Sequence, residues 1–91
     1  MLLMDRENLF VPGYSHVLSS TNDIAELEAL RLRVGAPPQA LDRRGSRPHL
    51  DLKLEARQRA LHDPAVRVFE TSRDLLRAWR ACQPPPGRRP S

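Results

Sequence analysis

Apolar residues in this chain fall into short runs separated by longer segments in which apolar and polar residues are mixed. The first run ends at Asp5, and the most regular run alternates β-branched and polar residues, which is typical of strands. A third, briefer run follows a pair of prolines that no helix can extend through. The pattern therefore predicts three strands, near residues 1–5, 38–42 and 65–69.

Between these runs, the longest mixed segment has the spacing of an amphipathic helix over residues 22–34. Its apolar positions recur every three or four residues, at Ile24, Leu27, Leu30 and Val34. The polar run Ser19–Asp23 precedes it, and such side chains favour a helix start. Gly35 follows it, where a helix end favours a residue free to adopt positive φ.

Two further helices are predicted, near residues 52–62 and 72–82. Asp51 stands where an N-cap residue of the first of these helices would lie. Thr71 and Asp74 resemble a capping box at the start of the second, with Asp in place of the usual Glu. Each helix is therefore expected to begin at a polar side chain that accepts hydrogen bonds from the backbone.

The order strand–helix, repeated three times, predicts an α/β fold with a short, mainly parallel three-stranded sheet and right-handed crossovers. We expect a minimal Rossmann-like domain over residues 1–82, without the G-x-G-x-x-G loop of a dinucleotide site. Residues 83–91 contain four of the nine prolines and nothing to bury, so they are expected to form a disordered tail rich in Pro and Arg.

Composition fits one small domain of 91 residues, with 40% hydrophobic and 29% charged residues. The net charge is +4, of which Arg88 and Arg89 supply two, so residues 1–82 carry +2 and the basic signal for nucleic acid is weak. The lone Cys82 favours a reducing cytoplasm, and the first apolar residues are interrupted too early for a signal peptide or a membrane span. The chain has only four aromatic residues, so its core is small, and self-association into a homodimer through an exposed apolar surface is expected.

Ligands of a parallel α/β sheet bind beyond the carboxyl ends of its strands. This rule selects a set of polar residues that follow the predicted strands: Asp5, His16, Arg43, Arg44, His49, Thr71 and Ser72. Asp51 lies two positions after His49. Two imidazoles and two carboxylates at one edge would suit a divalent metal, with Asp5, His16, His49 and Asp51 as candidate ligands, or general acid–base chemistry.

Each of these residues also has a purely structural interpretation. Asp51 at a helix start is typical of an N-cap. Asp5 would neutralise the neighbouring Arg6 or a loop arginine. The histidines lie in predicted loops, where side chains are commonly solvated. The two interpretations differ in geometry. A shared site requires the rings of His16 and His49 to approach within about 7 Å, with a carboxylate facing the same cleft.

Several short segments resemble a family of short bacterial and phage proteins known only as a domain of unknown function. That family has an initial strand ending in Asp, then W-x-H-L, E-L-H, H-Y-D-L and S-R-E-L segments. The matching segments here, over nearly all of residues 1–80, are Tyr14-Ser-His-Val-Leu18, Asp23-x-x-Glu-Leu27, Gly35, His49-Leu-Asp-Leu52, Arg57-x-x-Ala60 and Ser72-Arg-Asp-Leu-Leu76.

The resemblance implies no reaction, cofactor or partner. It marks five positions: Asp5, His16, His49, Asp51 and Arg57. The chain departs from the family pattern where Tyr14 replaces Trp, Glu28 replaces the helix His and Leu50 replaces Tyr. If the missing helix His belongs to a site, part of that site is lost here.

Three functions follow from these residues. The first is binding of an anionic ligand, a nucleotide or nucleic-acid phosphate, through the carboxyl edge of the sheet and the basic loop Arg43–Arg47. The second is metal-assisted hydrolysis of a phosphodiester by the two histidines and two aspartates. The third is a protein-interaction module, phage-encoded or bacterial, that regulates a larger partner without a site of its own. The first requires the fewest coincident geometries.

Overall fold

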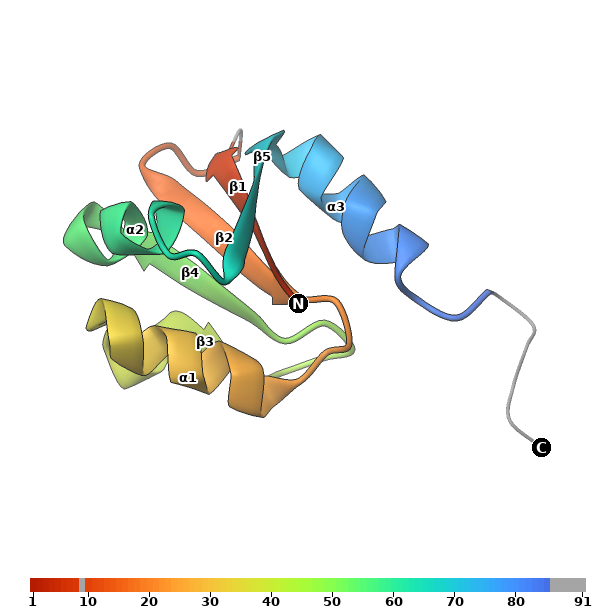
Figure 1. The fold of residues 1–91 in the computed structure, drawn as a ribbon, viewed down its shortest axis with the longest axis horizontal. Coiled ribbons are helices and arrows are strands. Elements are labelled where there is room, and N and C mark those ends of the chain that lie inside the picture. The colour runs from red at the N-terminus through yellow and green to blue at the C-terminus, as the bar shows by residue number, and fades with distance from the viewer. Residues whose placement is uncertain (9, 86–91) are drawn as a thin grey trace.

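The computed structural model describes residues 1–8 and 10–85 of the chain. Five strands form a single sheet in the order β3-β4-β2-β1-β5, and three helices pack on its two faces (Figure 1). The elements in chain order are β1 (Leu2–Glu7), β2 (Tyr14–Ser19), α1 (Ile24–Val34), the 3₁₀ turn η1 (Pro38–Ala40), β3 (Leu41–Asp42), β4 (His49–Lys53), α2 (Leu54–Leu61), β5 (Val66–Thr71) and α3 (Ser72–Ala81).

The sheet is mixed and mostly antiparallel, so the prediction of a mainly parallel, three-stranded, Rossmann-like sheet is wrong. β2 folds back antiparallel along β1, β4 is antiparallel to β2, and β3 is antiparallel to β4. β5 is parallel to β1. Antiparallel strands can be joined by a short loop, whereas parallel strands need a long crossover. The few residues between β1 and β2 are therefore enough to place the two strands side by side.

The prediction failed because it left out β2 and β4, which occupy the second and third places in the sheet. In β2 the residues facing the larger core are Ser15, Val17 and Ser19, all fully buried. Two serines at core positions conceal the alternation of apolar and polar residues that identifies a strand. The residues of β4 are predicted as a loop and a helix start, and the strand predicted near residues 38–42 has only two residues in the structure.

The three predicted helices are confirmed, and so are two of their caps. The Asp23 side chain accepts hydrogen bonds from the backbone N–H groups of Ala25 and Glu26 at the start of α1. Gly35 ends this helix with φ of 72°, in the left-handed region that glycine adopts without strain. At the start of α3, Thr71 accepts from the N–H of Asp74.

Asp51 does not cap a helix. It lies in β4, and α2 begins three residues later at Leu54, without a side-chain cap. The structural interpretation of this residue is therefore wrong, and its carboxylate is left to interact with side chains of the sheet.

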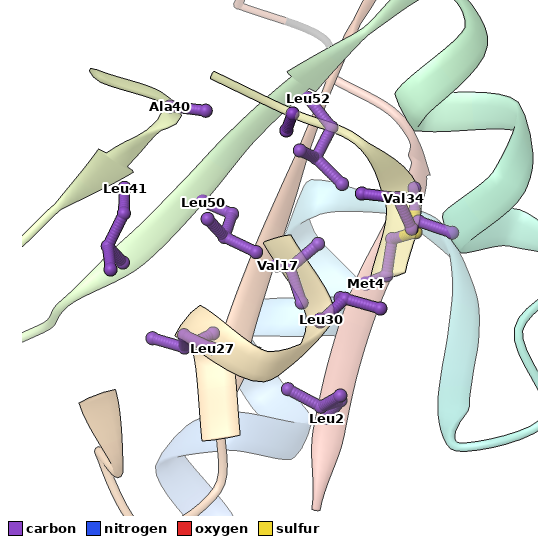
Figure 2. Packing of buried hydrophobic residues seen from close by; sticks show 12 residues of the cluster. Leu2, Met4, Val17, Leu27, Leu30, Val34, Ala40, Leu41, Leu50 and Leu52 are labelled. Atoms are coloured by element: carbon purple, nitrogen blue, oxygen red, sulfur yellow. The ribbon is translucent and has the colours of Figure 1, made fainter. Parts of the chain in front are cut away.

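The two faces of the sheet are covered unequally. α1 and α2 lie on one side and α3 on the other (Figure 1). The larger core cluster lies under α1 and α2, where leucines of the helix meet alternate residues of the strands (Figure 2). Its members include Leu2, Met4, Val17, Leu27, Leu30, Val34, Leu50 and Leu52.

On the opposite face, a smaller cluster forms under α3. Leu75 packs with Leu3 of β1 and Leu18 of β2, and Phe69, Leu76 and Trp79 surround them. α3 packs mainly along β1 and β5, so the part of this face formed by β2 and β4 retains partly exposed polar side chains. These side chains supply the candidate site.

Part of the predicted tail lies outside the described residues, namely 86–91. Just before it, the side chain of Gln83 donates to the carbonyl of Ser20 and accepts from the amide of Asn22. Across residues 1–8 and 10–85, no helix is long and apolar enough to cross a membrane.

The larger cluster should dominate the stability of the domain. Leu50 of β4 is fully buried in it, so Leu50→Ala is expected to lower the free energy of unfolding by about 2–5 kcal/mol. Leu32→Ala is the matched control, because Leu32 on α1 is 64% exposed and its loss should change stability by about 0.5 kcal/mol or less. Urea denaturation measures both, and equal effects would contradict the assignment of β4 as a core strand.

Candidate functional site

Antiparallel pairing brings the four predicted His and Asp residues onto one face of the sheet. His16 of β2 lies directly opposite Asp51 of β4, and Leu18 lies opposite His49. Directly paired residues share a face, as do residues two apart along a strand. Because Leu18 packs under α3, both histidines and Asp51 lie on the α3 side, where Asp5 of β1 contacts His16.

Asp5 is the buried end of this group. Its side chain is 0% exposed and accepts hydrogen bonds from the backbone N–H of His16 and the hydroxyl of Ser72, both at 2.6 Å. Its Oδ2 lies 3.3 Å from Nδ1 of the His16 ring. Burial alone would raise the pKa of Asp5, but the hydrogen bonds from His16 and Ser72 outweigh it and hold the pKa below the ordinary aspartate value.

His16 is held on its other side by Asp51. Nε2 of His16 lies 3.5 Å from one oxygen of Asp51, and Nε2 of His49 lies 3.4 Å from the other oxygen. The centroids of the two rings are 5.8 Å apart, with an angle of 71° between their planes. The rings therefore approach within the distance that a shared site requires, and the Asp51 carboxylate lies between them.

The electrostatics of His49 differ from those of an isolated imidazole. Its interaction with Asp51 raises the pKa above the ordinary value of 6.5, against the effect of burial, and a hydrogen bond with the carbonyl of Arg47 adds to the rise. Asp42, opposite His49 on β3, is itself ionised, since hydrogen bonds from Arg44 lower its pKa to about 2. His49 is therefore protonated over a wider pH range than an ordinary histidine.

Asn8 fixes the loop beside His16. Its side-chain oxygen accepts from the backbone N–H groups of Phe10 and Val11, at 2.9 and 3.2 Å. Its side-chain nitrogen lies 3.3 Å from Nδ1 and 3.4 Å from Nε2 of His16. The loop after β1 and the imidazole thus hold one another in place.

A pocket of about 170 Å³ opens between this group and α3. One part of its wall is polar, from His16, His49, Arg47 and Ser72, and the other part is apolar. The apolar residues are Phe10, Leu18, Leu75 and Leu76. Few polar groups in a mostly apolar concavity are typical of small-molecule sites.

A second hollow adjoins the pocket along α3, since both are lined by Phe10, Ser72 and Leu76. Its remaining lining residues are Arg73 and Arg80, both exposed. The two arginines are seven positions apart, which is two helical turns, and so they lie along one side of α3. The surface next to the pocket is therefore positively charged.

Three predicted ligand-binding arginines lie away from the pocket. Arg44 pairs with Asp42, and Arg43 lies 3.9 Å from Glu28 of α1. Arg57 reaches from α2 to the hydroxyl of Ser15 and to the carbonyl of Arg6, on the sheet side opposite the histidines. None of the three lines the pocket beside the histidines, and Arg57 instead joins α2 to the sheet.

The four His and Asp side chains form a line rather than a shell around one point. Asp5 contacts His16, His16 contacts Asp51, and Asp51 contacts His49. Within the part of the chain that the structure describes, no group of three or more His, Cys, Asp or Glu residues is arranged to hold a metal ion. The arrangement is instead suited to the transfer of protons along the line.

The sequence selects the polar part of the pocket wall but not its apolar part. His16, His49 and Ser72 follow predicted strands, and Arg47 belongs to the basic loop predicted to bind an anion. Phe10, Leu75 and Leu76 gave no signal of a site, because apolar residues in a loop and on a helix face usually belong to a core. For the hollow beside the pocket, the sequence offers one signal, the seven-residue spacing that places Arg73 and Arg80 on one side of a helix.

Comparisons with protein-family models, with curated proteins and with solved structures found no match to this chain. The resemblance of its segments to a family of bacterial and phage proteins therefore stays a prediction.

The hydroxyl of Ser72 should contribute to stability through Asp5. Ser72→Ala leaves a buried carboxylate without one of its donors and is expected to cost about 1–3 kcal/mol at pH 7. Because the folded-state pKa of Asp5 is lowered, this contribution is present at neutral pH and is lost as the pH falls through that pKa. Urea denaturation between pH 7 and pH 2 measures it. Ser46→Ala in the exposed loop is the control, and an equal effect there would contradict the prediction.

The proton affinity of His49 should depend on Asp51. In Asp51→Asn the pKa of His49 is expected to fall, because the carboxylate that raises it is gone. In the unmodified chain, the stability that His49 contributes is fully present below pH 6.5 and is lost as the pH rises through its higher folded-state pKa. NMR titration of the ring protons measures the change. His62, exposed at the end of α2, serves as the internal control, and an unchanged His49 titration would contradict the assignment.

Proposed function

We propose that this protein binds a small anionic ligand, a nucleotide or a nucleic-acid phosphate, in the pocket beside α3. One observation carries the proposal: the pocket joins two imidazoles and the Arg47 guanidinium to an apolar wall. Cationic and hydrogen-bonding groups recognise a phosphate, and an apolar wall recognises the flat face of a base. The binding site is a face of the sheet rather than its carboxyl edge, since β2 and β4 are antiparallel.

The charge around the pocket supports an anion. Arg47 lines the pocket, Arg73 and Arg80 line the adjoining hollow, and His49 holds its proton to a pH above that of an ordinary histidine. The charge of Asp5 is buried and accepts several hydrogen bonds, so it opposes an entering anion less than a free carboxylate would. Two further negative groups lie beside His49: Asp51, 42% exposed and shared between both rings, and Asp42, which pairs with Arg44.

The size of the pocket limits what it holds. Its volume of about 170 Å³ is below the range of about 300–1,000 Å³ that encloses a drug-sized ligand. A single base or a single ribose phosphate fits this size, and the rest of a longer ligand would lie along the adjoining hollow. We place this function in a reducing cytoplasm, because the single cysteine, Cys82, is an exposed free thiol.

Binding should depend on Arg47. Titration calorimetry with adenosine 3′-monophosphate and with inorganic phosphate is expected to show binding that Arg47→Ala weakens by about tenfold, the loss of one charge-assisted hydrogen bond. Arg77→Ala is the control, since Arg77 is exposed on α3 but outside the pocket.

Two results would contradict the proposal. One is the absence of binding by both anions at millimolar concentration. The other is an equal loss of affinity in the Arg47 and Arg77 variants, which would indicate attraction by overall charge rather than a site. Circular dichroism spectra verify that both variants are folded, because Arg47 also lies 5.4 Å from the ring centroid of Trp79.

A further inference from the structure

We propose that the pocket cleaves RNA without a metal, with His16 as general base and His49 as general acid in an intramolecular transesterification. The inference rests on the proposed function, since the substrate is a ribonucleotide chain whose phosphodiester occupies the pocket. It adds a reaction to the binding site.

His16 is oriented as a base. The buried Asp5 carboxylate lies beside Nδ1 and favours the proton on that nitrogen. The side-chain nitrogen of Asn8, which can only donate, lies 3.4 Å from Nε2 and favours that nitrogen as the proton acceptor. Asp51, 3.5 Å from Nε2, is placed to take the proton on from it. The backbone N–H of His16 bonds to the Asp5 carboxylate, so ring and main chain are fixed together. Asp5 contacts no substrate in this scheme and is a positioning residue.

His49 is oriented as an acid. Its Nδ1 donates to the carbonyl of Arg47, and its Nε2 faces Asp51. Both neighbours favour the imidazolium form, and the raised pKa extends the pH range over which the ring carries its proton. A general acid needs this property, because it must be protonated when the leaving oxygen departs.

The two rings are placed to act on one phosphate. Each must come within about 2.6–3.2 Å of its own oxygen, one entering and one leaving, so both must line the same pocket. Their centroids are 5.8 Å apart and both rings line the pocket wall. Without a substrate the two Nε2 atoms face the Asp51 carboxylate, so in this scheme the phosphate oxygens replace Asp51 as their partners. Arg47 in the same wall supplies positive charge for the phosphoryl oxygens.

The nucleophile is taken from the substrate. In the described residues, no serine, threonine or cysteine side chain is hydrogen-bonded to His16, and the hydroxyl of Ser72 donates to Asp5 instead. A ribonucleotide brings its own nucleophile, the 2′-hydroxyl, and needs neither a metal-activated water nor a protein side chain. This requirement selects RNA over DNA.

The reaction balances without a further reactant. Nε2 of His16 takes the 2′-hydroxyl proton as the bond from the 2′-oxygen to phosphorus forms. The bond from phosphorus to the 5′-oxygen breaks, and that oxygen takes the proton of His49 Nε2. The products are a 2′,3′-cyclic phosphate and a 5′-hydroxyl. His16 is left protonated and His49 neutral, and Asp51, in contact with both Nε2 atoms, returns the proton.

The hollow along α3 favours an RNA chain over a mononucleotide as the substrate. Arg73 and Arg80 line it and it is continuous with the pocket through shared residues. Arginines spaced along one side of a helix are suited to successive phosphates, which makes binding of a longer ligand dependent on salt.

The test uses the full chain with a fluorescent DNA oligonucleotide that contains one ribonucleotide, in the presence of EDTA. Cleavage at that position with a 2′,3′-cyclic phosphate end is expected, together with a rate that rises and then falls with pH. His16→Ala and His49→Ala should each reduce the rate about 100-fold or more. The control His62→Ala removes an exposed histidine on the far end of α2 and should leave the rate unchanged.

Asp51→Asn gives a readout that loss of structure alone would not produce. By lowering the pKa of His49 it should move the alkaline side of the pH–rate profile to lower pH. An unmoved alkaline limb would show that His49 is not the acid.

An all-DNA oligonucleotide of the same sequence separates the two proposals. If it binds with dependence on Arg47 while the ribonucleotide substrate is not cleaved, the catalytic inference is overturned and the binding function stands. If neither oligonucleotide binds, both fail. Cleavage that needs a divalent metal, or that persists in the double variant of His16 and His49 purified in the same way, also overturns the inference.

Discussion

The fold is organised around one buried negative charge. Asp5 lies at 0% exposure in the middle of the sheet, and an ionised group there is tolerated because its oxygens accept hydrogen bonds from neighbouring elements. One donor is the backbone of β2 and another is the first residue of α3. The constraint therefore determines both the register of the β1–β2 hairpin and the place where α3 begins. The ring of His16 is oriented by the same carboxylate, which lies beside its Nδ1.

The two faces of the sheet differ because two helices cover one face and a single helix covers the other. Two helices seal the face that carries the larger core, and leucines of α1 fill it. A single helix on the other face covers β1 and β5 and contributes a smaller cluster around Leu75. The uncovered remainder needs polar residues, and a polar strip beside an apolar helix wall is a suitable place for a ligand.

Local signals in the sequence were sufficient for the helices. The periodicity of α1, its Asp23 cap and Gly35, and the Thr71 cap of α3 are properties of a few adjacent residues. Strand order depends on which segments pair across the chain, and the two serines that β2 buries remove the local signal for it. The parallel sheet was inferred from alternation alone, after two strands had been missed.

The His and Asp residues were selected correctly as neighbours, but for a reason that the structure does not share. The rule about carboxyl ends assumed parallel strands, whereas His16 and Asp51 meet as opposed residues of an antiparallel pair. The same rule also selected Arg43 and Arg44, which the β3–β4 loop carries away from the pocket. Spacing in the sequence cannot distinguish these cases, because the face on which a strand residue points depends on a register that long-range pairing decides.

The attachment of α3 has a consequence for how a ligand enters. Its first residue, Ser72, is bonded to Asp5, and at its other end Trp79 donates to the side chain of Asn22 while Gln83 bonds to Ser20 and Asn22. These hydrogen bonds hold both ends of α3 against the rest of the domain. The pocket is thus preformed, and the protein loses little conformational entropy when a ligand binds. Adaptation to a new ligand would come from exchange of single side chains along α3 rather than from movement of the helix.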